Sequence, residues 1–265
     1  MQRRDFLAGL AVLPALPMLA HASGESLRIG IFPGTGTADM LREELRAANR
    51  SFAKAVADAL GRQPSLTIFT ALKSINRSIE NGRLDVYFAP PTVAVSALDK
   101  GYVPIARVKD NLNFMLVRRK GAKVASVALT ERESLPDVMS RYVLKGKKED
   151  VRLFNLKSQE DVILAMERNY AQAGALGGKL GKALVEKGEY ESWYPLPPAQ
   201  GFSVVASKQL SEADRKKLSS AISALNPAII GEMQKVFVAK LGSFVPDNGA
   251  ELVTLKQAMK TAGYL

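Results

Sequence analysis

The sequence predicts an α/β fold, and two features of the chain support this prediction. From Leu27 onward, short apolar runs alternate with stretches whose apolar residues recur at spacings of three and four, which is the pattern of strands alternating with amphipathic helices. The chain has 265 residues, which is enough for two lobes and for a core that needs no disulfides. We therefore expect strands and helices to alternate around a largely parallel sheet.

Three strands and three helices are expected in the first hundred residues. Buried apolar runs predict strands at 27–32, 66–70 and 84–89. Thr37 fits the N-cap of a long helix that Gly61 ends. A short helix is expected at 74–80, and Pro90-Pro91-Thr92 opens a third helix that closes at Gly101.

The rest of the chain continues the alternation. Strands are expected at 103–108, 112–118, 124–129, 151–156, 171–176 and 201–206, and 193–198 is expected to be a loop. A helix is expected at 135–144, and another follows the short strand at 171–176. Ser158 and Ser211 each begin a helix with an N-cap signature. The last stretches are expected to be helical, broken by Pro227 and Pro246.

The first 22 residues have the layout of an export signal. A paired arginine motif, Arg-Arg-x-Phe-Leu, is followed by an uncharged run from Ala8 to Ala20 and by Ala20-His21-Ala22. This order predicts cleavage after Ala22, export by the twin-arginine route and a periplasmic location. The alternative is a short membrane anchor, but the uncharged run is shorter than the roughly 20 residues that span a bilayer.

Composition excludes several kinds of chemistry. The chain has no cysteine, and its one histidine, His21, lies inside the expected signal. Ser-His-Asp and Cys-His catalysis, zinc sites of Cys or His, and the usual haem and iron–sulfur ligands are therefore excluded from the mature chain. Carboxylate, lysine and tyrosine chemistry remain open, as does an all-oxygen metal site. We expect no cofactor.

The formal net charge of +11 raises three alternatives, which are nucleic acid, an anionic surface and an anionic ligand. The basic residues are scattered along the chain. The densest group, Lys145 to Lys148, is followed at once by Glu149 and Asp150, which favours a solvated surface. No nucleic-acid fold motif is present, so we expect no nucleic-acid partner.

The order of these segments resembles a known family. The strand Leu-Arg-Ile-Gly-Ile at 27–31, the run Asn-Gly-Arg-Leu-Asp-Val-Tyr-Phe-Ala-Pro-Pro at 81–91, and Pro-Ile-Ala-Arg-Val at 104–108 before Phe-Met-Leu-Val at 114–117 carry the resemblance. They are similar to the periplasmic phosphate/phosphite/phosphonate-binding family, a branch of the type II solute-binding proteins of ABC transporters.

The resemblance implies a two-lobed type II periplasmic-binding-protein fold with a ligand cleft between the lobes and two crossover strands. On that pattern lobe 1 comprises residues 24–114 and 201–265, and lobe 2 comprises residues 115–200. The implied function is capture of a small, anionic ligand by lobe closure. An ABC permease or a membrane sensor would then recognise the closed form. We expect a monomer.

The candidate ligand residues of lobe 1 follow three strands. Ligands of open α/β sheets bind beyond the carboxyl ends of strands, and three segments there run into helix N-termini, which favour anions. Hydroxyl groups there can instead cap their own helices, and the lysine can lie on the surface. The candidates are Thr35, Thr37, Lys73, Ser74, Pro91 and Thr92.

Lobe 2 departs from the family pattern. Where the family has a Ser-x-Ser-Gly turn, this chain has Thr-Glu-Arg-Glu-Ser at 130–134. The family's tyrosine at the start of the second lobe 1 helix is replaced by Leu72, and its Gly-x-x-Asp pattern is replaced by Gln-Ala-Gly-Ala at 172–175. The candidates here are Thr130 and Arg132, and Asn113 and Phe114 at the crossover between the lobes are further candidates. Arg132 can clamp a carboxylate or phosphate in a fork, or pair with a neighbouring glutamate on the surface.

Three functions follow, in order of preference. The first is a solute-binding protein whose closed form is favoured by its ligand. The second is a sensory or accessory binding protein of the same fold without a transporter, because fold does not fix function. The third is a cofactor-free enzyme, which would need a carboxylate pair or a lysine with a shifted pKa in the cleft. No sequence pattern announces such a pair, so we expect no catalytic activity.

Overall fold

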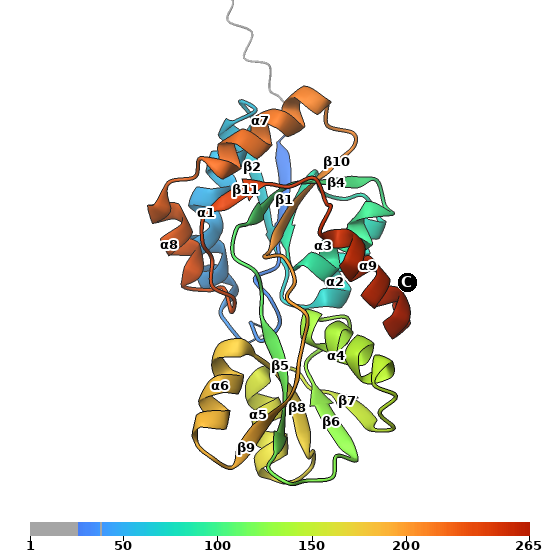
Figure 1. The fold of residues 1–265 in the computed structure, drawn as a ribbon. Helices are drawn as coiled ribbons and strands as arrows, with labels where there is room; N and C mark the ends of the chain where they lie inside the picture. Colours follow the sequence, from blue (N-terminus) through green and yellow to red (C-terminus); the bar gives the residue numbers. More distant parts are fainter. Residues whose placement is uncertain (1–25, 38) are drawn as a thin grey trace, which may run out of the picture.

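The structure is a computed structural model that describes residues 26–37 and 39–265. The described chain forms two lobes, each built around its own sheet (Figure 1). The expected export signal and its cleavage site after Ala22 lie outside the described residues.

The upper lobe in Figure 1 holds a six-stranded sheet of order β11-β4-β10-β3-β1-β2. Its strands are β1 (Leu27–Ile31), β2 (Pro64–Ile68), β3 (Val86–Ala89), β4 (Tyr102–Val108), β10 (Ser203–Ser207) and β11 (Phe244–Pro246). β1 pairs in parallel with β2 and β3, whereas β10 and β11 run antiparallel to their neighbours. Its helices are α1 (Arg42–Asp58), α2 (Leu72–Glu80), α3 (Pro91–Leu98), α7 (Glu212–Ser223), α8 (Pro227–Gln234) and α9 (Leu252–Ala262).

The lower lobe holds a five-stranded sheet of order β7-β6-β8-β5-β9. Its strands are β5 (Phe114–Arg119), β6 (Ser126–Leu129), β7 (Arg152–Asn155), β8 (Ala173–Gly177) and β9 (Tyr190–Pro195). Its helices are α4 (Leu135–Gly146), α5 (Gln159–Glu167) and α6 (Gly178–Glu186). β6 pairs in parallel with β7 and β8, and β5 runs antiparallel to β8 and β9.

Two chain segments connect the lobes, one between β4 and β5 and the other between β9 and β10. They lie side by side, because Leu112 and Ala199 form an antiparallel bridge between them. The strands that follow these segments, β5 and β10, run against the parallel strands of their sheets, as does the edge strand β11. The α/β class and the two-lobed arrangement with two crossover segments are therefore confirmed.

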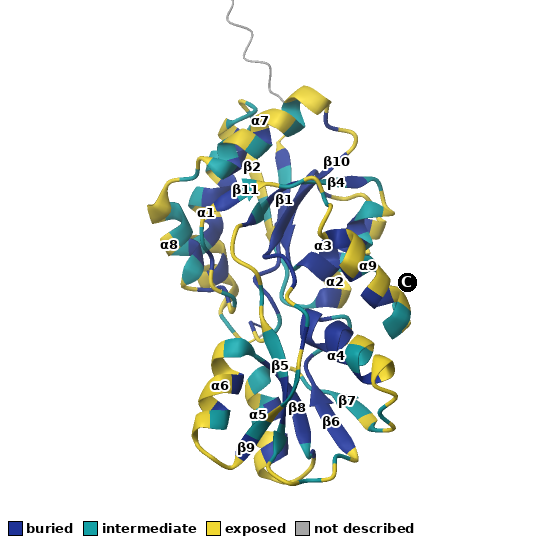
Figure 2. Cartoon of the chain, viewed as in Figure 1, coloured by how far each residue is buried: buried dark blue, intermediate teal, exposed yellow. Residues whose placement is uncertain are grey.

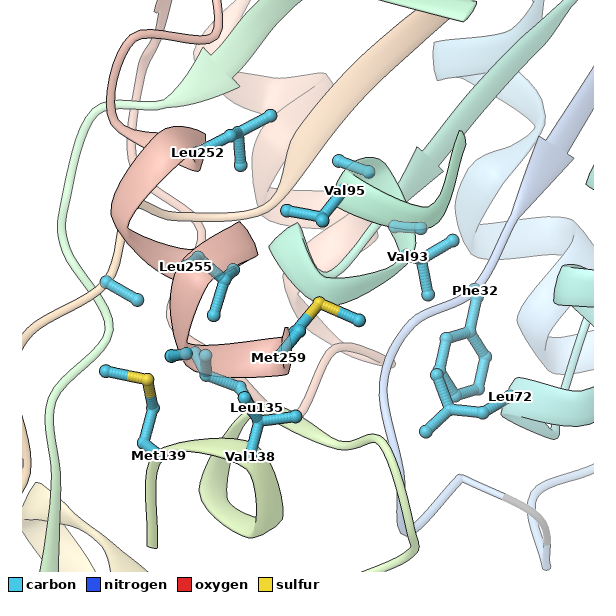
Figure 3. Packing of buried hydrophobic residues seen from close by; sticks show 14 of the residues in the cluster. Phe32, Leu72, Val93, Val95, Leu135, Val138, Met139, Leu252, Leu255 and Met259 are labelled. Carbon is cyan, nitrogen blue, oxygen red and sulfur yellow. The ribbon is translucent and has the colours of Figure 1, made fainter. Parts of the chain in front are cut away.

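Helices cover both faces of each sheet, so the central strands are buried, whereas the edge strands β2 and β7 are partly exposed. Figure 2 shows the dark blue core along the central strands. On one face of the upper sheet, aromatic rings gather around Phe88, which packs within 6 Å of Phe52, Phe202, Phe237 and Phe244. On the other face, a second apolar cluster continues from the upper lobe into the lower one. It includes Val93 of α3, Leu255 of α9 and Leu135 of α4 (Figure 3).

Two N-caps expected from the sequence are confirmed, and one is wrong. Ser158 and Asp161 form a reciprocal capping box at α5, and the Ser211 side chain accepts a hydrogen bond from Asp214 N at α7. The long helix α1 begins after Leu41, not after Thr37. The Thr37 hydroxyl instead donates to the carbonyl of Gly34 at 2.9 Å, which closes the loop after β1.

The expectation of a loop at 193–198 is wrong in part, whereas the breaks expected at Pro227 and Pro246 are confirmed. The predicted loop at 193–198 begins inside β9, which ends at Pro195, and the stretch around Pro246 is the short edge strand β11. Both prolines are the last residues of edge strands, where no ladder N–H is needed. The break at Pro227 lies between α7 and α8, and Pro227 opens α8 at its first position, as its missing N–H and fixed φ allow.

Candidate functional site

A cavity of about 910 Å³ lies between the two lobes, beside the connecting segments. The upper lobe contributes the loop after β1, the starts of α2 and α3, and the loop after α8. The lower lobe contributes the loop after β6 and the starts of α4, α5 and α6. Residues 110–113 of the first connecting segment and Phe114 at the start of β5 form part of the wall. The cavity is therefore the cleft that the fold predicts.

Helix N-termini converge on this cavity from both lobes. Residues at the start of five helices line it, namely Leu72, Thr92, Leu135, Gln159 and Gly178. The first-turn N–H groups of a helix have no partner within the helix, and the helix dipole adds partial positive charge there. Several such ends around one space favour a negatively charged group.

Thr92 is the polar side chain of the cavity that most needs a partner. It is 2 % exposed, and its Oγ1 atom has no hydrogen-bond partner among the described residues. A buried polar atom without a partner is costly, so such atoms call for an explanation. Pro91, which precedes it in α3, offers no N–H. The hydroxyl and backbone N–H of Thr92 are thus the donors that this helix start can present to a ligand.

Two further hydroxyl groups come from the lower lobe. Thr130 Oγ1 and Ser134 Oγ lie 2.7 Å apart and share one hydrogen bond, and both residues are buried and line the cavity. Ser134 is the N-cap of α4, yet its hydroxyl makes no capping bond. The second proton of this pair is therefore free to point into the cavity.

Apolar side chains cover much of the remaining wall. Phe32 follows β1, Phe202 precedes β10, Leu112 belongs to the first connecting segment, and Phe114 is the first residue of β5. These side chains cannot satisfy a bare ion, but they favour the apolar body of an organic ligand. The cavity thus combines polar helix ends with an apolar wall.

Charged side chains stand at the rim. Lys179 and Lys182 are three residues apart on α6, and Lys240 faces the cavity from the upper lobe. All three are exposed. Asp110 and Glu160 also line the cavity. The lysines therefore exceed the carboxylates at this rim by one charge.

Five of the ten residues singled out from the sequence line the cavity. They are Thr35, Thr92, Asn113, Phe114 and Thr130. The Asn113 amide donates only a long bond, 3.5 Å, to the carbonyl of Asn111. The structure therefore brings these five together from four different segments, although their contact with a ligand stays a prediction.

The other five lie elsewhere. Thr37 is buried against Gly34, and Pro91 is buried at the start of α3 behind Thr92. Lys73 and Ser74 line a separate surface hollow of about 590 Å³. Leu72 lies on the face of α2 that lines the cleft, whereas Lys73 and Ser74 lie on another face of this helix. Arg132 is exposed, with its guanidinium 5.7 Å from the centre of the Tyr264 ring.

Sequence reasoning missed several cavity residues. Ser134 is the N-cap of α4, and Gln159 follows the N-cap of α5. Gly177-Gly178 joins β8 to α6. Each of these turns could have been found by applying to lobe 2 the rule that ligands bind beyond strand ends. Phe32, Phe202 and the stretch 238–240 carry no such signal, because their place in the wall depends on how the lobes meet.

The described residues contain neither a candidate metal site nor a candidate membrane span. Within residues 26–37 and 39–265, no group of three or more histidine, cysteine, aspartate or glutamate side chains is arranged to hold a metal ion. Over the same residues, no helix has the length and apolar character required to cross a membrane.

Comparison with protein families identifies the chain. The model of the phosphonate periplasmic substrate-binding proteins of ABC transporters matches residues 36–246, which is most of the chain. The chain belongs to this family. No curated protein sequence matches it. Membership gives the chain a solute-binding role, with a small-molecule ligand and an ABC permease as the family's partners.

Solved structures share the fold at low sequence identity. XAC2383 from Xanthomonas citri, bound to ATP, has a TM-score of 0.73 at 12 % identity, with 90 % of this chain and 98 % of that chain covered. PhnD1 from Prochlorococcus marinus, in complex with methylphosphonate, has a TM-score of 0.69 at 14 % identity, with 91 % and 99 % covered. A binding protein component of an ABC phosphonate transporter from Pseudomonas aeruginosa has a TM-score of 0.63 at 16 % identity, with 90 % and 86 % covered. These likenesses establish the type II periplasmic-binding-protein fold.

Proposed function

We propose that this member of the family captures an organic anion, with a negatively charged head and an apolar body, in the cavity between its lobes. The observation that carries the proposal is the buried, unpartnered Thr92 hydroxyl at the point where helix N-termini converge. An anionic head placed there would accept hydrogen bonds from Thr92, from the Thr130–Ser134 pair and from first-turn N–H groups.

The size and lining of the cavity support the organic part of the ligand. Its volume of about 910 Å³ falls in the range of roughly 300–1,000 Å³ that suits molecules larger than a bare oxyanion. Phe32, Phe114 and Phe202 offer an apolar surface beside the polar helix ends. A phosphonate, sulfonate or carboxylate that carries an aliphatic or aromatic group would use both parts of the site.

The ligands of two structural neighbours agree with this chemistry. XAC2383 holds ATP and PhnD1 holds methylphosphonate, and both ligands are anions with an organic group. At such low identity the ligand itself does not transfer, and the argument for this chain is the arrangement of its own donors.

The mechanism would be lobe closure. On our assignment the moving bodies are residues 24–114 with 201–265, and residues 115–200, joined at the Leu112–Ala199 bridge. A ligand that contacts Thr92 on one lobe and Thr130 on the other binds the closed form better, and so shifts the population towards it. Ligand donors on both lobes are what such a shift requires.

The cellular setting of the proposal comes from the N-terminus. We infer export by the twin-arginine route, cleavage after Ala22 and a monomer that delivers its ligand to an ABC permease in the periplasm. We propose no catalytic activity, because a mature chain without histidine and cysteine lacks the common nucleophile–base pairs. Mass spectrometry of the bound ligand before and after incubation tests that statement.

The experiment is a thermal-unfolding screen of purified protein against phosphate, methylphosphonate, alkyl and aryl phosphonates, sulfonates and carboxylates. A ligand at 100 times its Kd should stabilise the fold by about 2.7 kcal/mol, which is roughly 5–10 °C for a chain of this size. We expect larger shifts for organic anions than for phosphate. A flat response to the whole set would contradict the proposal.

A pair of variants locates the site. Thr92→Val removes the unpartnered hydroxyl and keeps the shape, so we expect anion affinity to fall about tenfold or more, which is about 1.4 kcal/mol and near the contribution of a hydrogen bond to a charged group. The unfolding temperature of the variant without ligand should be unchanged or slightly higher than that of the wild-type protein. The matched control is Thr67→Val, because Thr67 is exposed on β2 beside the other hollow.

A further inference from the structure

One loop of the lower lobe is held by two separate parts of the upper lobe. The loop runs from Thr130 to Ser134, between β6 and α4, and we call it the lock loop. Its two end residues, Thr130 and Ser134, line the cavity and share a hydrogen bond. Whatever fixes the lock loop therefore fixes two hydroxyl groups of the candidate site.

The first contact is with α2 of the upper lobe. Burial raises the pKa of the Glu131 carboxyl group, and the backbone N–H of Leu72, at the N-terminus of α2, lies close enough to act against that rise. The Asn76 amide, one turn further along α2, donates to Glu133 Oε2 at 3.0 Å. Both glutamates thus face α2 across the boundary between the lobes, and Glu131 does so at a helix N–H that has no partner within the helix.

The backbone of the lock loop carries strain at the same place. Glu133 has a φ of 66°, which lies in the left-handed region that residues other than glycine seldom adopt. Such a conformation persists only where surrounding contacts impose it. The contacts that hold Glu133 are the Asn76 amide on its side chain and Asp137 on its backbone N–H, at 3.1 Å.

The second contact is with the C-terminal end of the chain. Asp137 in α4 is fully buried, and the hydroxyl of Tyr264, which follows α9, donates to its Oδ2 atom. That oxygen also accepts the bond from Glu133 N. The Tyr264 ring lies within 6 Å of the guanidinium groups of Arg132 and Arg141. One tyrosine of the upper lobe thus contacts both the lock loop and the helix that follows it.

Apolar packing brings α9 to this position. In Figure 3, α9 lies between α3 of the upper lobe and α4 of the lower lobe. Leu255 and Met259 of α9 share a buried cluster with Val95 of α3 and with Leu135 and Val138 of α4. Tyr264 therefore follows a helix that is seated on the upper lobe, and its side chain reaches the lower one.

We propose that Asn76 and Tyr264 act as a latch on the lock loop, which holds the lobes closed and sets the positions of Thr130 and Ser134 in the cavity. Neither residue lines the cavity, so both are positioning residues that act through Glu133 and Asp137. The latch regulates the site described above and rests on the proposed function only in taking that cavity as the ligand site.

The test measures the distance between the lobes and requires no ligand. Because the chain has no cysteine, Ala183→Cys on exposed α6 and Lys235→Cys at the end of α8 can carry two spin labels without further changes. We expect a narrow distance distribution in the doubly labelled protein. Asn76→Ala and Tyr264→Phe should each broaden the distribution and shift it to longer distances, and the combination should shift it further.

The control and the unfolding measurement separate a latch from a general loss of stability. Tyr142→Phe removes a hydroxyl from an exposed tyrosine of α4 and should leave the distribution unchanged. Thermal unfolding of every variant is recorded in parallel. If Asn76→Ala and Tyr264→Phe lower the unfolding temperature but leave the distances as they were, the residues are merely structural and the latch is overturned. A flat ligand screen would sink the proposed function while leaving this measurement intact.

Discussion

Leu112 and Ala199 exchange both of their backbone hydrogen bonds, at 2.8 Å and 3.1 Å, and so join the two segments that connect the lobes. Gly201 lies just beyond this bridge. A Cβ atom built there would meet the carbonyl oxygens of Asp110 and Val108 at 2.6 Å and 2.7 Å, which no real Cβ atom tolerates. The two segments can therefore run this close only because residue 201 has no side chain.

Replacement of that glycine should destabilise the fold. We expect Gly201→Ala to cost about 1–3 kcal/mol in the free energy of unfolding, as overpacking generally does, because the atoms that must move are backbone atoms. Chemical denaturation measures the change. The matched control is Gly231→Ala in α8, where a Cβ meets nothing within 4 Å, and where we expect a gain of about 0.5–1 kcal/mol from helix propensity. Equal effects at both positions would contradict the steric argument.

The rim lysines should speed the capture of an anion. Lys179, Lys182 and Lys240 surround the cavity mouth, and charges of one sign at a mouth raise the association rate of an opposite charge. We expect Lys179→Gln with Lys240→Gln to lower the association rate of the anion that gives the largest thermal shift, by more at low salt than at high salt. Stopped-flow fluorescence measures the rate.

The control for the rim is a lysine at the opposite end of the same helix. Lys187 is exposed just after α6 and does not line the cavity, so Lys187→Gln should leave the association rate nearly unchanged. An identical loss of rate in both variants would show that the net charge of the protein, and not the rim, steers the ligand.

The fold was predictable because its signals are local. The strand β3 with Pro90-Pro91-Thr92 and the capping box at Ser158 were recognisable from short runs, since periodicity and N-cap chemistry act within a few residues. The strands β9 and β11 were missed because their prolines indicate loops, and only pairing at a sheet edge makes strands of them.

The candidate site was predictable only in part, for a different physical reason. Thr35 and Thr92 lie where strand ends must place them, and both line the cavity. Which face of α2 meets the cleft depends on packing, so nothing local distinguishes Lys73 and Ser74 from Leu72. The wall residue Phe202 and the latch residue Tyr264 are positioned by contacts between elements far apart in the sequence, which composition and spacing cannot reveal.

Tyr264 should make stability depend on alkaline pH. Burial, together with the hydrogen bond to Asp137 and its negative charge, raises the pKa of Tyr264 to about 12, whereas Arg141 and Arg132 act in the opposite direction. The folded protein therefore keeps this proton more tightly than the unfolded chain, whose tyrosine pKa is about 10. The stabilisation is fully present below about pH 10 and is lost as pH rises towards about 12.

The comparison with Tyr264→Phe isolates this contribution from the other groups that titrate there. The wild-type protein should be more stable than the variant at pH 8 by about 1 kcal/mol, the usual worth of one hydrogen bond, and the difference should shrink between pH 10 and pH 12. Urea denaturation at several pH values measures both. A difference that stays constant up to pH 12 would show that the hydroxyl is not held by Asp137.

Glu131 should make lobe closure depend on acid pH. Burial between the lobes raises the pKa of its carboxyl group, and the neighbouring charge of Glu133 raises it further, while the Leu72 N–H lowers it. Burial also raises the pKa of Glu133, and the charges of Asp137 and Glu80 raise it further. Arg132 and the Asn76 amide act to lower this pKa. Opening exposes both carboxyl groups to water, which returns their pKa values towards the usual range.

The closed form therefore binds protons more tightly than the open form, and lowering the pH from 7 to about 4.5 should favour closure. The labelled protein described above reports this as a shift to shorter distances. Glu131→Gln keeps an oxygen beside the Leu72 N–H but has no charge to desolvate, so the variant should be more closed at pH 7 and respond less to acid. A Glu131→Gln protein that follows the wild-type pH profile would mean that Glu131 does not enter the boundary between the lobes as an ionised group, and that its contact with α2 has no part in closure.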